Sequence, residues 1–203
     1  MVFLLLIALL AWIVLGTWGL VRLAKQPPAV SIGIALAHGR PTDPGEARCT
    51  WSDIELRTND GLALPMWRVD GDSPTGPTLI VLHDWGSSPV AHLDELAALT
   101  QHASVVLMPT LRGHASQTGR CSLGPRELDD VATLLATIDG DVVIHGTGLG
   151  GLLAKRLQGT SAVTQVVVHR PWANAQEGIS LMLTQRGQIA FPFAWLARIC
   201  LPS

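Results

Sequence analysis

The segment of this chain best suited to chemistry is a glycine-rich turn at residues 145–151, HGTGLGG, which follows an apolar run and precedes a helical apolar pattern. Gly146, Gly148 and Gly151 satisfy G-x-G-x-x-G, a pattern whose backbone cradles a dinucleotide pyrophosphate. Arg170 follows the next apolar run, where NADP-binding folds place a cation. That fingerprint normally lies in the first strand–helix–strand unit of its domain, whereas three or more strands are predicted before it here. An NADP site is therefore an alternative and not the main prediction.

Alternating strands and helices must position this turn. Two stretches with alternating apolar residues flank the turn signal Asn59-Asp60-Gly61 and predict a β-hairpin over residues 53–57 and 62–69. Short continuous apolar runs predict buried strands at residues 78–82, 103–108 and 141–144, and a further strand at 163–168. Helical spacing predicts helices that begin at residue 88, and over residues 128–138 and 152–157. The sequence therefore predicts an α/β domain with a mostly parallel sheet and helices on both faces.

Three segments that follow predicted strands carry a resemblance to the α/β hydrolases, from about Asp53 onward. The first, HDWGSS at residues 83–88, resembles the family's HG-x-G-S-S loop. The second, RGH at residues 112–114, resembles D-x-R-G-H-G, with Thr110 where the family usually has Asp. The third is the glycine-rich turn, which resembles the nucleophile elbow G-x-S-x-G-G. Their order and placement imply the α/β-hydrolase fold.

The resemblance puts Gly148 where the family has its catalytic serine. Glycine tolerates the strained backbone of the elbow, but it offers no hydroxyl to attack a substrate. The backbone N–H groups of Trp85 and Leu149 would form the oxyanion hole, and the remaining elbow glycines would be Gly146, Gly150 and Gly151. Thr147 is a displaced candidate nucleophile, although neighbouring side chains at a tight turn point in different directions. We therefore expect no intact catalytic nucleophile.

The family places an acid and then a histidine after later strands, and this sequence lacks both. Residues 171–203, which resemble the start of a lid region, contain Glu177 as their only acid and no histidine. His83, His114 and His145 belong to earlier loops and strand ends, where loop structure or packing is the expected role. We expect a domain that is incomplete at its C-terminal end and non-catalytic. The alternative is a fragment or decayed copy of a serine hydrolase that cleaved esters or peptide-like bonds.

The N-terminal segment is predicted to be a transmembrane anchor over residues 1–24. No charged side chain precedes Arg22, and a helix of this length spans a bilayer core of about 30 Å. A cleavable signal peptide is the rival, but it would carry a basic region before a shorter apolar core. Trp18 suits the membrane interface, and Arg22 with Lys25 places the following domain in the cytoplasm by the positive-inside rule. Residues 25–50 contain several prolines and are predicted to be a linker to a core domain over residues 51–170.

Composition limits the other partners. The 14 Lys and Arg residues are scattered and the formal net charge is −2, so nucleic acid is not expected as a partner. Cys49, Cys121 and Cys200 are far apart and form no C-x-x-C pair, so free thiols are predicted and neither a metal nor a cofactor is expected. Strand 163–168 would lie at an open sheet edge. We expect a protein partner, a second copy or further chain to cover it.

Overall fold

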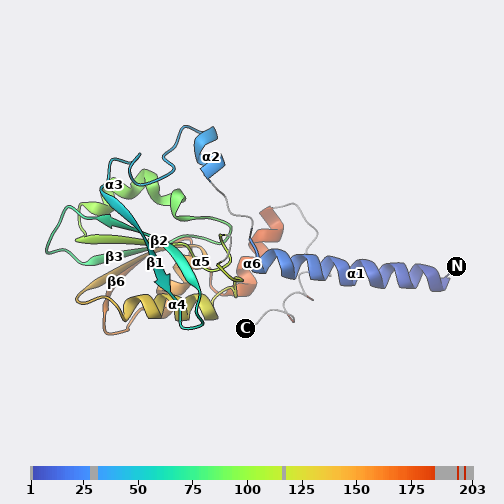
Figure 1. Ribbon diagram of the computed structural model, residues 1–203. Helices are drawn as coiled ribbons and strands as arrows, with labels where there is room; N and C mark the ends of the chain where they lie inside the picture. Colours follow the sequence, from blue (N-terminus) through green and yellow to red (C-terminus); the bar gives the residue numbers. More distant parts are fainter. Residues whose placement is uncertain (1, 28–31, 116–117, 186–195, 197–198, 200–203) are drawn as a thin grey trace.

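The computed structural model describes residues 2–27, 32–115, 118–185, 196 and 199, and its centre is one six-stranded mixed sheet (Figure 1). The strands are β1 (Trp51–Arg57), β2 (Ala63–Asp70), β3 (Thr78–Leu82), β4 (Val105–Pro109), β5 (Val142–Thr147) and β6 (Val163–His169). Their order in the sheet is β1-β2-β4-β3-β5-β6. Strands β1, β2 and β4 pair antiparallel, and β4, β3, β5 and β6 pair parallel. The predicted hairpin and the four other predicted strands are all present.

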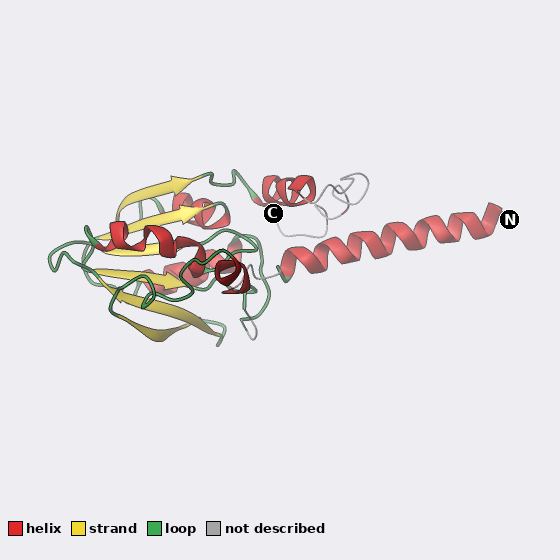
Figure 2. Ribbon diagram, turned by 90° about the horizontal axis from the view of Figure 1, so that it is seen from above, coloured by secondary structure: helices red, strands yellow, loops and turns green. Residues whose placement is uncertain are grey.

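Two apolar cores confirm that helices cover both faces of the sheet (Figure 2). One face is packed by α4 (Pro125–Leu135) and α5 (Leu149–Leu157), with Ile80, Leu82 and Ile144 fully buried beneath them. The other face carries η1, a 3-10 helix over Pro89–Glu95, and α3 (Leu96–Thr100), packed against strand residues such as Val69 and Val106. Helix was predicted from residue 88 onward. The first two turns are 3-10 in geometry, which brings side chains three residues apart into line.

Strand β6 is the last strand of the sheet, as predicted, and its burial is incomplete. Val167 is 41% exposed, whereas the central strands β3 and β4 are almost wholly buried. What covers this edge stays a prediction.

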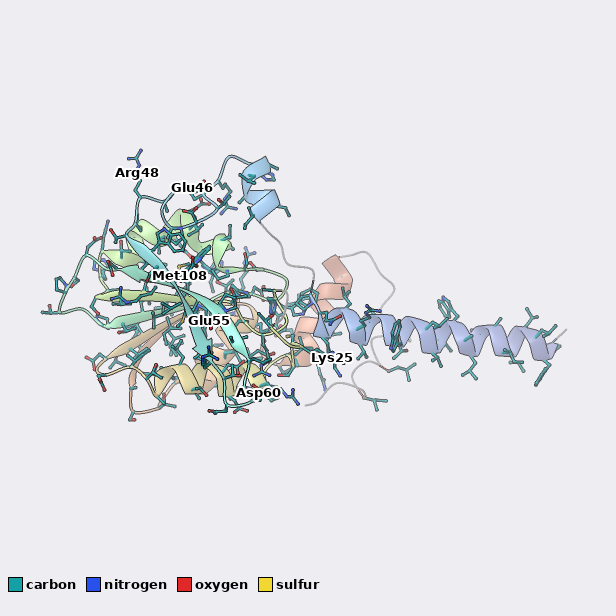
Figure 3. The ribbon with its side chains drawn as sticks, viewed as in Figure 1. Lys25, Glu46, Arg48, Glu55, Asp60 and Met108 are labelled. Carbon is teal, nitrogen blue, oxygen red and sulfur yellow. The ribbon has the colours of Figure 1, made fainter. Side chains whose placement is uncertain are left out.

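Helix α1 (Val2–Lys25) projects from one end of the domain, and its last turn is packed into it (Figure 1). Ala24 is 4% exposed and contacts the core together with Leu20 and Val21. The carbonyl of Ala24 accepts a hydrogen bond from the Trp85 indole at 3.0 Å, and the carbonyl of Lys25 accepts one from the Cys121 N–H at 2.8 Å. Lys25 is labelled at this junction in Figure 3. The apolar helix is thus joined rigidly to the domain at its C-terminal end.

The segment predicted to be an irregular linker contains regular structure. Helix α2 (Ile32–Ala37) lies within it, and a turn at residues 42–46 is closed by hydrogen bonds from Thr42 to Glu46. The prolines predicted to break structure flank α2 and do not interrupt it. Beyond β6, helix α6 (Ala175–Gln185) lies in the predicted lid region, and most of the chain after it falls outside the described residues.

Candidate functional site

The turn between β5 and α5 has the sharp geometry predicted for an elbow. Gly148 has φ 55° and ψ −113°, a conformation that residues with a side chain rarely adopt. A Cβ atom at Gly150 would clash with the carbonyl of Leu82, and one at Gly146 would clash with that of Gly150. These glycines therefore allow the start of α5 to lie directly against strands β3 and β5.

Asp84, the residue before Trp85, fills the predicted oxyanion hole. Its Oδ1 accepts a hydrogen bond from the N–H of Trp85 at 2.7 Å and another from the N–H of Leu149 at 2.8 Å. The two N–H groups therefore converge as the resemblance implies, but the oxygen that they bind belongs to the protein itself. A Cβ atom built on Gly148 would overlap the same carboxylate.

Burial and hydrogen bonding act in opposite directions on Asp84. Desolvation raises the pKa of its carboxyl, and the two N–H donors partly offset that rise by stabilising the anion. The carboxylate also lies at the N-terminus of α5, where the helix dipole favours negative charge. Two N–H donors and a helix terminus thus offset part of the cost of burying the charge of Asp84.

Thr147 lines an open cleft of about 440 Å³ together with Asp84, so the two share one pocket. A role for Thr147 as a displaced nucleophile stays a prediction. Within the described part of the chain no hydrogen bond joins its hydroxyl to a histidine, although His145 and His169 line the same cleft.

His83 and His114 have the packing role predicted for them. Both rings are at most 2% exposed, and their centroids lie 4.9 Å apart in an edge-to-face arrangement. Nε2 of His83 accepts a hydrogen bond from the Leu111 N–H at 3.0 Å, and its Nδ1 donates to the carbonyl of Asp84 at 2.8 Å. Burial lowers the pKa of both imidazoles, and of His83 well below its usual value. Both are therefore neutral structural groups.

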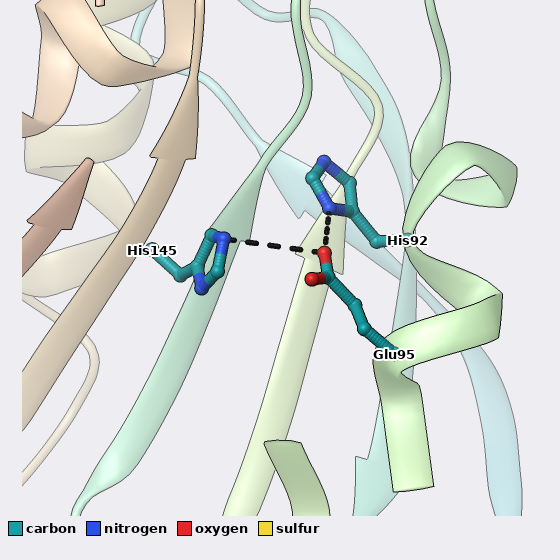
Figure 4. Close-up of side chains that lie close together, drawn as sticks. All are labelled: His92, Glu95 and His145. Atoms are coloured by element: carbon teal, nitrogen blue, oxygen red, sulfur yellow. Dashed lines mark hydrogen bonds and ion pairs between the residues drawn. The ribbon is translucent and has the colours of Figure 1, made fainter. Parts of the chain in front are cut away.

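His145 is also largely buried, and it packs beside His92. Its Nε2 lies 3.9 Å from Glu95 Oε1, which also accepts a hydrogen bond from His92 Nδ1 at 2.5 Å (Figure 4). Burial lowers the pKa of His145, although Glu95 partly opposes that shift. Sequence reasoning missed His92, Glu95 and also His169, which lines the same cleft. The His-x-x-Glu spacing of His92 and Glu95 was visible in the sequence, but His145, the third residue of this cluster, is far away along the chain.

The RGH segment is held by a buried ion-pair network. Arg112 donates to Asp130 at 2.6 and 2.5 Å and to Asp60 at 2.8 and 3.0 Å. These bonds hold the pKa of Asp60 well below its usual range and raise that of the guanidinium. The network fixes the loop after β4 to α4 and to the hairpin turn, where Asp60 is labelled in Figure 3.

Comparison with solved structures gives many proteins of the same architecture. An esterase of Pyrococcus furiosus superposes with a TM-score of 0.68 at 21% identity, covering 89% of this chain and 70% of the esterase. A hydrolase from Pseudomonas aeruginosa gives 0.53 at 23% identity over 68% of this chain and 54% of its own. An alpha/beta hydrolase from Novosphingobium aromaticivorans gives 0.50 at 26% identity over 58% and 43%.

No family model matches the sequence, and a search of curated proteins finds no match. The present chain spans about two thirds of the length of the esterase structures. At these identities the similarity concerns the fold, and activity must be argued from the site.

Proposed function

The chain has the α/β-hydrolase fold, and from this premise we propose that it is a membrane-anchored protein that does not carry out acyl transfer through its elbow. The observation that carries the proposal is the position of Asp84. Its carboxylate takes both N–H groups that would stabilise a tetrahedral oxyanion, and it occupies the space in which a side chain at position 148 would begin. Nucleophile and oxyanion hole are therefore both lost at one point.

Electrostatics strengthens this argument. A developing oxyanion is stabilised by donors that are free and preorganised, and losing one such donor costs about 10²- to 10³-fold in turnover. Here both donors are bound to an anion, which would also repel the charge that develops on a substrate. Even an attack by Thr147 would therefore lack stabilisation of its intermediate. A binding or scaffolding role is what this site supports.

Among the described residues, α1 is the one helix long and apolar enough to span a membrane, and a signal sequence would pass the same test. Its packing favours an anchor that is retained. Cleavage within it would remove the Ala24 carbonyl from the Trp85 indole and expose core contacts of Leu20 and Val21. Because α1 contacts the loop that follows β3 and carries Asp84, a retained α1 would hold the C-terminal end of that strand close to the bilayer.

The proposed topology has one span with the domain in the cytoplasm, on the basis of Arg22 and Lys25 at the end of α1. In sealed membrane vesicles of known orientation, protease should remove the domain only when the cytoplasmic face is accessible. Sequencing of the N-terminus of the membrane-bound protein should find residues of α1 still attached. A mature chain that begins after Lys25 would refute the anchor.

A fluorophosphonate probe tests the absence of acyl chemistry. Membranes that contain the full chain should show no labelled band at its mass, while an active serine hydrolase added to the same sample is labelled. Stoichiometric labelling of the chain would contradict the proposal. Loss of that label in Thr147→Ala, with retention in Gly148→Ala, would identify the threonine as the nucleophile.

The dinucleotide alternative is not favoured by the same geometry. A pyrophosphate would need the N–H groups at the start of α5, and the Leu149 N–H already binds the carboxylate of Asp84. Two anions would then compete for one helix terminus. Titration with NADPH should show no saturable micromolar binding, and saturable binding that is lost in Arg170→Ala would restore this alternative.

A further inference from the structure

Three potential metal ligands converge in the cleft beside the elbow. They are His92 and Glu95 on η1 and His145 on β5, and their ligand atoms all lie within 4.8 Å of one another. Figure 4 shows a nitrogen of each imidazole turned toward the same carboxylate oxygen of Glu95. His92 is 7% exposed and His145 16% exposed at the side chain, so both rings are held by packing, while Glu95 is 46% exposed.

Local structure explains why these residues meet. In a 3-10 helix, side chains at positions i and i+3 are eclipsed, so η1 places His92 and Glu95 directly side by side. Side chains alternate along a strand, and in β5 residues 142, 144 and 146 are buried on the face covered by α5. His145 therefore points to the opposite face, on which η1 lies.

We propose that His92, Glu95 and His145 bind a divalent transition-metal ion of the Zn²⁺ class. Two imidazole nitrogens and one carboxylate oxygen form a donor set typical of zinc sites that keep an open position. Donor atoms on a tetrahedral Zn²⁺ ion lie about 3.4 Å apart, given bond lengths of about 2.1 Å. The observed separations of 2.5 and 3.9 Å from Glu95 Oε1 lie on either side of this value, and all the ligand atoms lie within 4.8 Å of one another.

The surroundings of the three ligands suit a cation. Asp84 lines the same cleft, as does Asp94, which forms an ion pair with Arg40, and among the described residues that line the cleft there is no Lys or Arg. The cleft is open, so solvent or an anionic ligand has access to any coordination position that the protein leaves free. A bound metal would give the cleft an electrophilic centre near an elbow without a nucleophile. The proposal does not depend on whether the elbow is inactive.

The test is a titration of the full chain, purified in detergent without a polyhistidine tag and stripped with a chelator. Co²⁺ reports its coordination through visible absorption, and Zn²⁺ then competes for the same site. We expect one saturable site with the absorption of a four- or five-coordinate ion. Glu95→Gln keeps an acceptor for His92 but removes the charge, and it should weaken Co²⁺ binding by at least about tenfold. His145→Gln should have a similar effect.

His102→Gln is the matched control, because His102 is exposed and lies outside the cluster on the same side of the sheet. It should bind Co²⁺ as wild type does. Zn²⁺ should raise the melting temperature of wild type and of the control, but not that of Glu95→Gln. The proposal is overturned if wild type shows no saturable binding, in which case the cluster is a hydrogen-bonded set, or if Glu95→Gln and His145→Gln retain wild-type affinity.

Discussion

The pairing of Gly148 with Asp84 predicts a large energetic coupling between two residues that lie far apart in the sequence. In Gly148→Ala, the new Cβ atom would overlap the carboxylate of Asp84. The alanine would also have to adopt a positive φ of 55°. Backbone strain of this kind costs about 2 kcal/mol. Overpacking against the carboxylate adds about 2 kcal/mol. The single variant should therefore lose about 4 kcal/mol of unfolding free energy, the sum of these two costs.

Asp84→Ala removes the atoms that the new methyl group would overlap most, because the three heavy atoms nearest to a Cβ at position 148 belong to that carboxylate. In this background Gly148→Ala should cost only the backbone strain of about 2 kcal/mol. The double-mutant cycle should then give a coupling energy of about 2 kcal/mol, within the range for residues in contact. At about 2–4 °C per kcal/mol, Gly148→Ala should lower the melting temperature by about 8–16 °C alone and about 4–8 °C beside Asp84→Ala.

Scanning fluorimetry of the four proteins in one detergent measures this cycle. Gly159→Ala is the matched control, because Gly159 has φ 95° and nothing lies within 4 Å of its virtual Cβ. It should be destabilised by backbone strain equally with and without Asp84→Ala. An equal loss for Gly148→Ala in both backgrounds would refute the idea that the carboxylate fills the space beside the elbow.

Three further variants, one of them with a control variant, test other parts of the structure. Because burial raises the pKa of Asp84, its ionised form is disfavoured on folding, so Asp84→Asn should melt no lower than wild type at pH 7.5. As the pH falls through that raised pKa, the melting temperature of wild type should rise relative to that of Asp84→Asn. A large loss of melting temperature in Asp84→Asn at pH 7.5 would contradict this. Arg112→Ala leaves a buried carboxylate unpaired and should cost about 3–5 kcal/mol in thermal or urea unfolding. The exposed ion-pair variant Arg68→Ala should cost at most about 1 kcal/mol, and equal losses would mean that burial is unimportant. Trp85→Phe removes the hydrogen bond from the indole to the Ala24 carbonyl, which is worth about 1 kcal/mol. Tryptic cleavage at the end of α1 should therefore accelerate about fivefold. An unchanged cleavage rate would mean that this hydrogen bond does not hold the helix against the domain.

The fold was predictable because its signals are local. Apolar runs such as residues 78–82 identify a strand buried on both faces, and the hairpin turn at residues 59–61 fixes the register of β1 against β2. The shape of the elbow was predictable for the same reason, since it depends on closely spaced glycines. Helix α2 was missed because six residues between prolines give too short a periodic pattern.

The chemistry of the site was less predictable because it depends on residues that meet only in the folded chain. Aspartate stands where the family's loop has glycine, and this departure was visible in HDWGSS. Its consequence required knowing that β3 and β5 are neighbours, which brings position 84 to the start of α5. The His92–Glu95–His145 cluster depends on the same kind of contact, because η1 and β5 are separated by β4 and α4 along the chain.

The two departures from the hydrolase pattern, Gly148 and Asp84, are best understood as one physical exchange. Without a carboxylate at position 84, the N–H groups of Trp85 and Leu149 would have no protein acceptor, at a cost of about 1–3 kcal/mol for an unsatisfied donor. A carboxylate at position 84 alone would overlap whatever side chain position 148 carried. Together they satisfy both donors and keep the turn intact. The stabilisation that a hydrolase reserves for its transition state is present here in the resting fold, so a serine restored at position 148 would still lack an oxyanion hole until Asp84 was also removed.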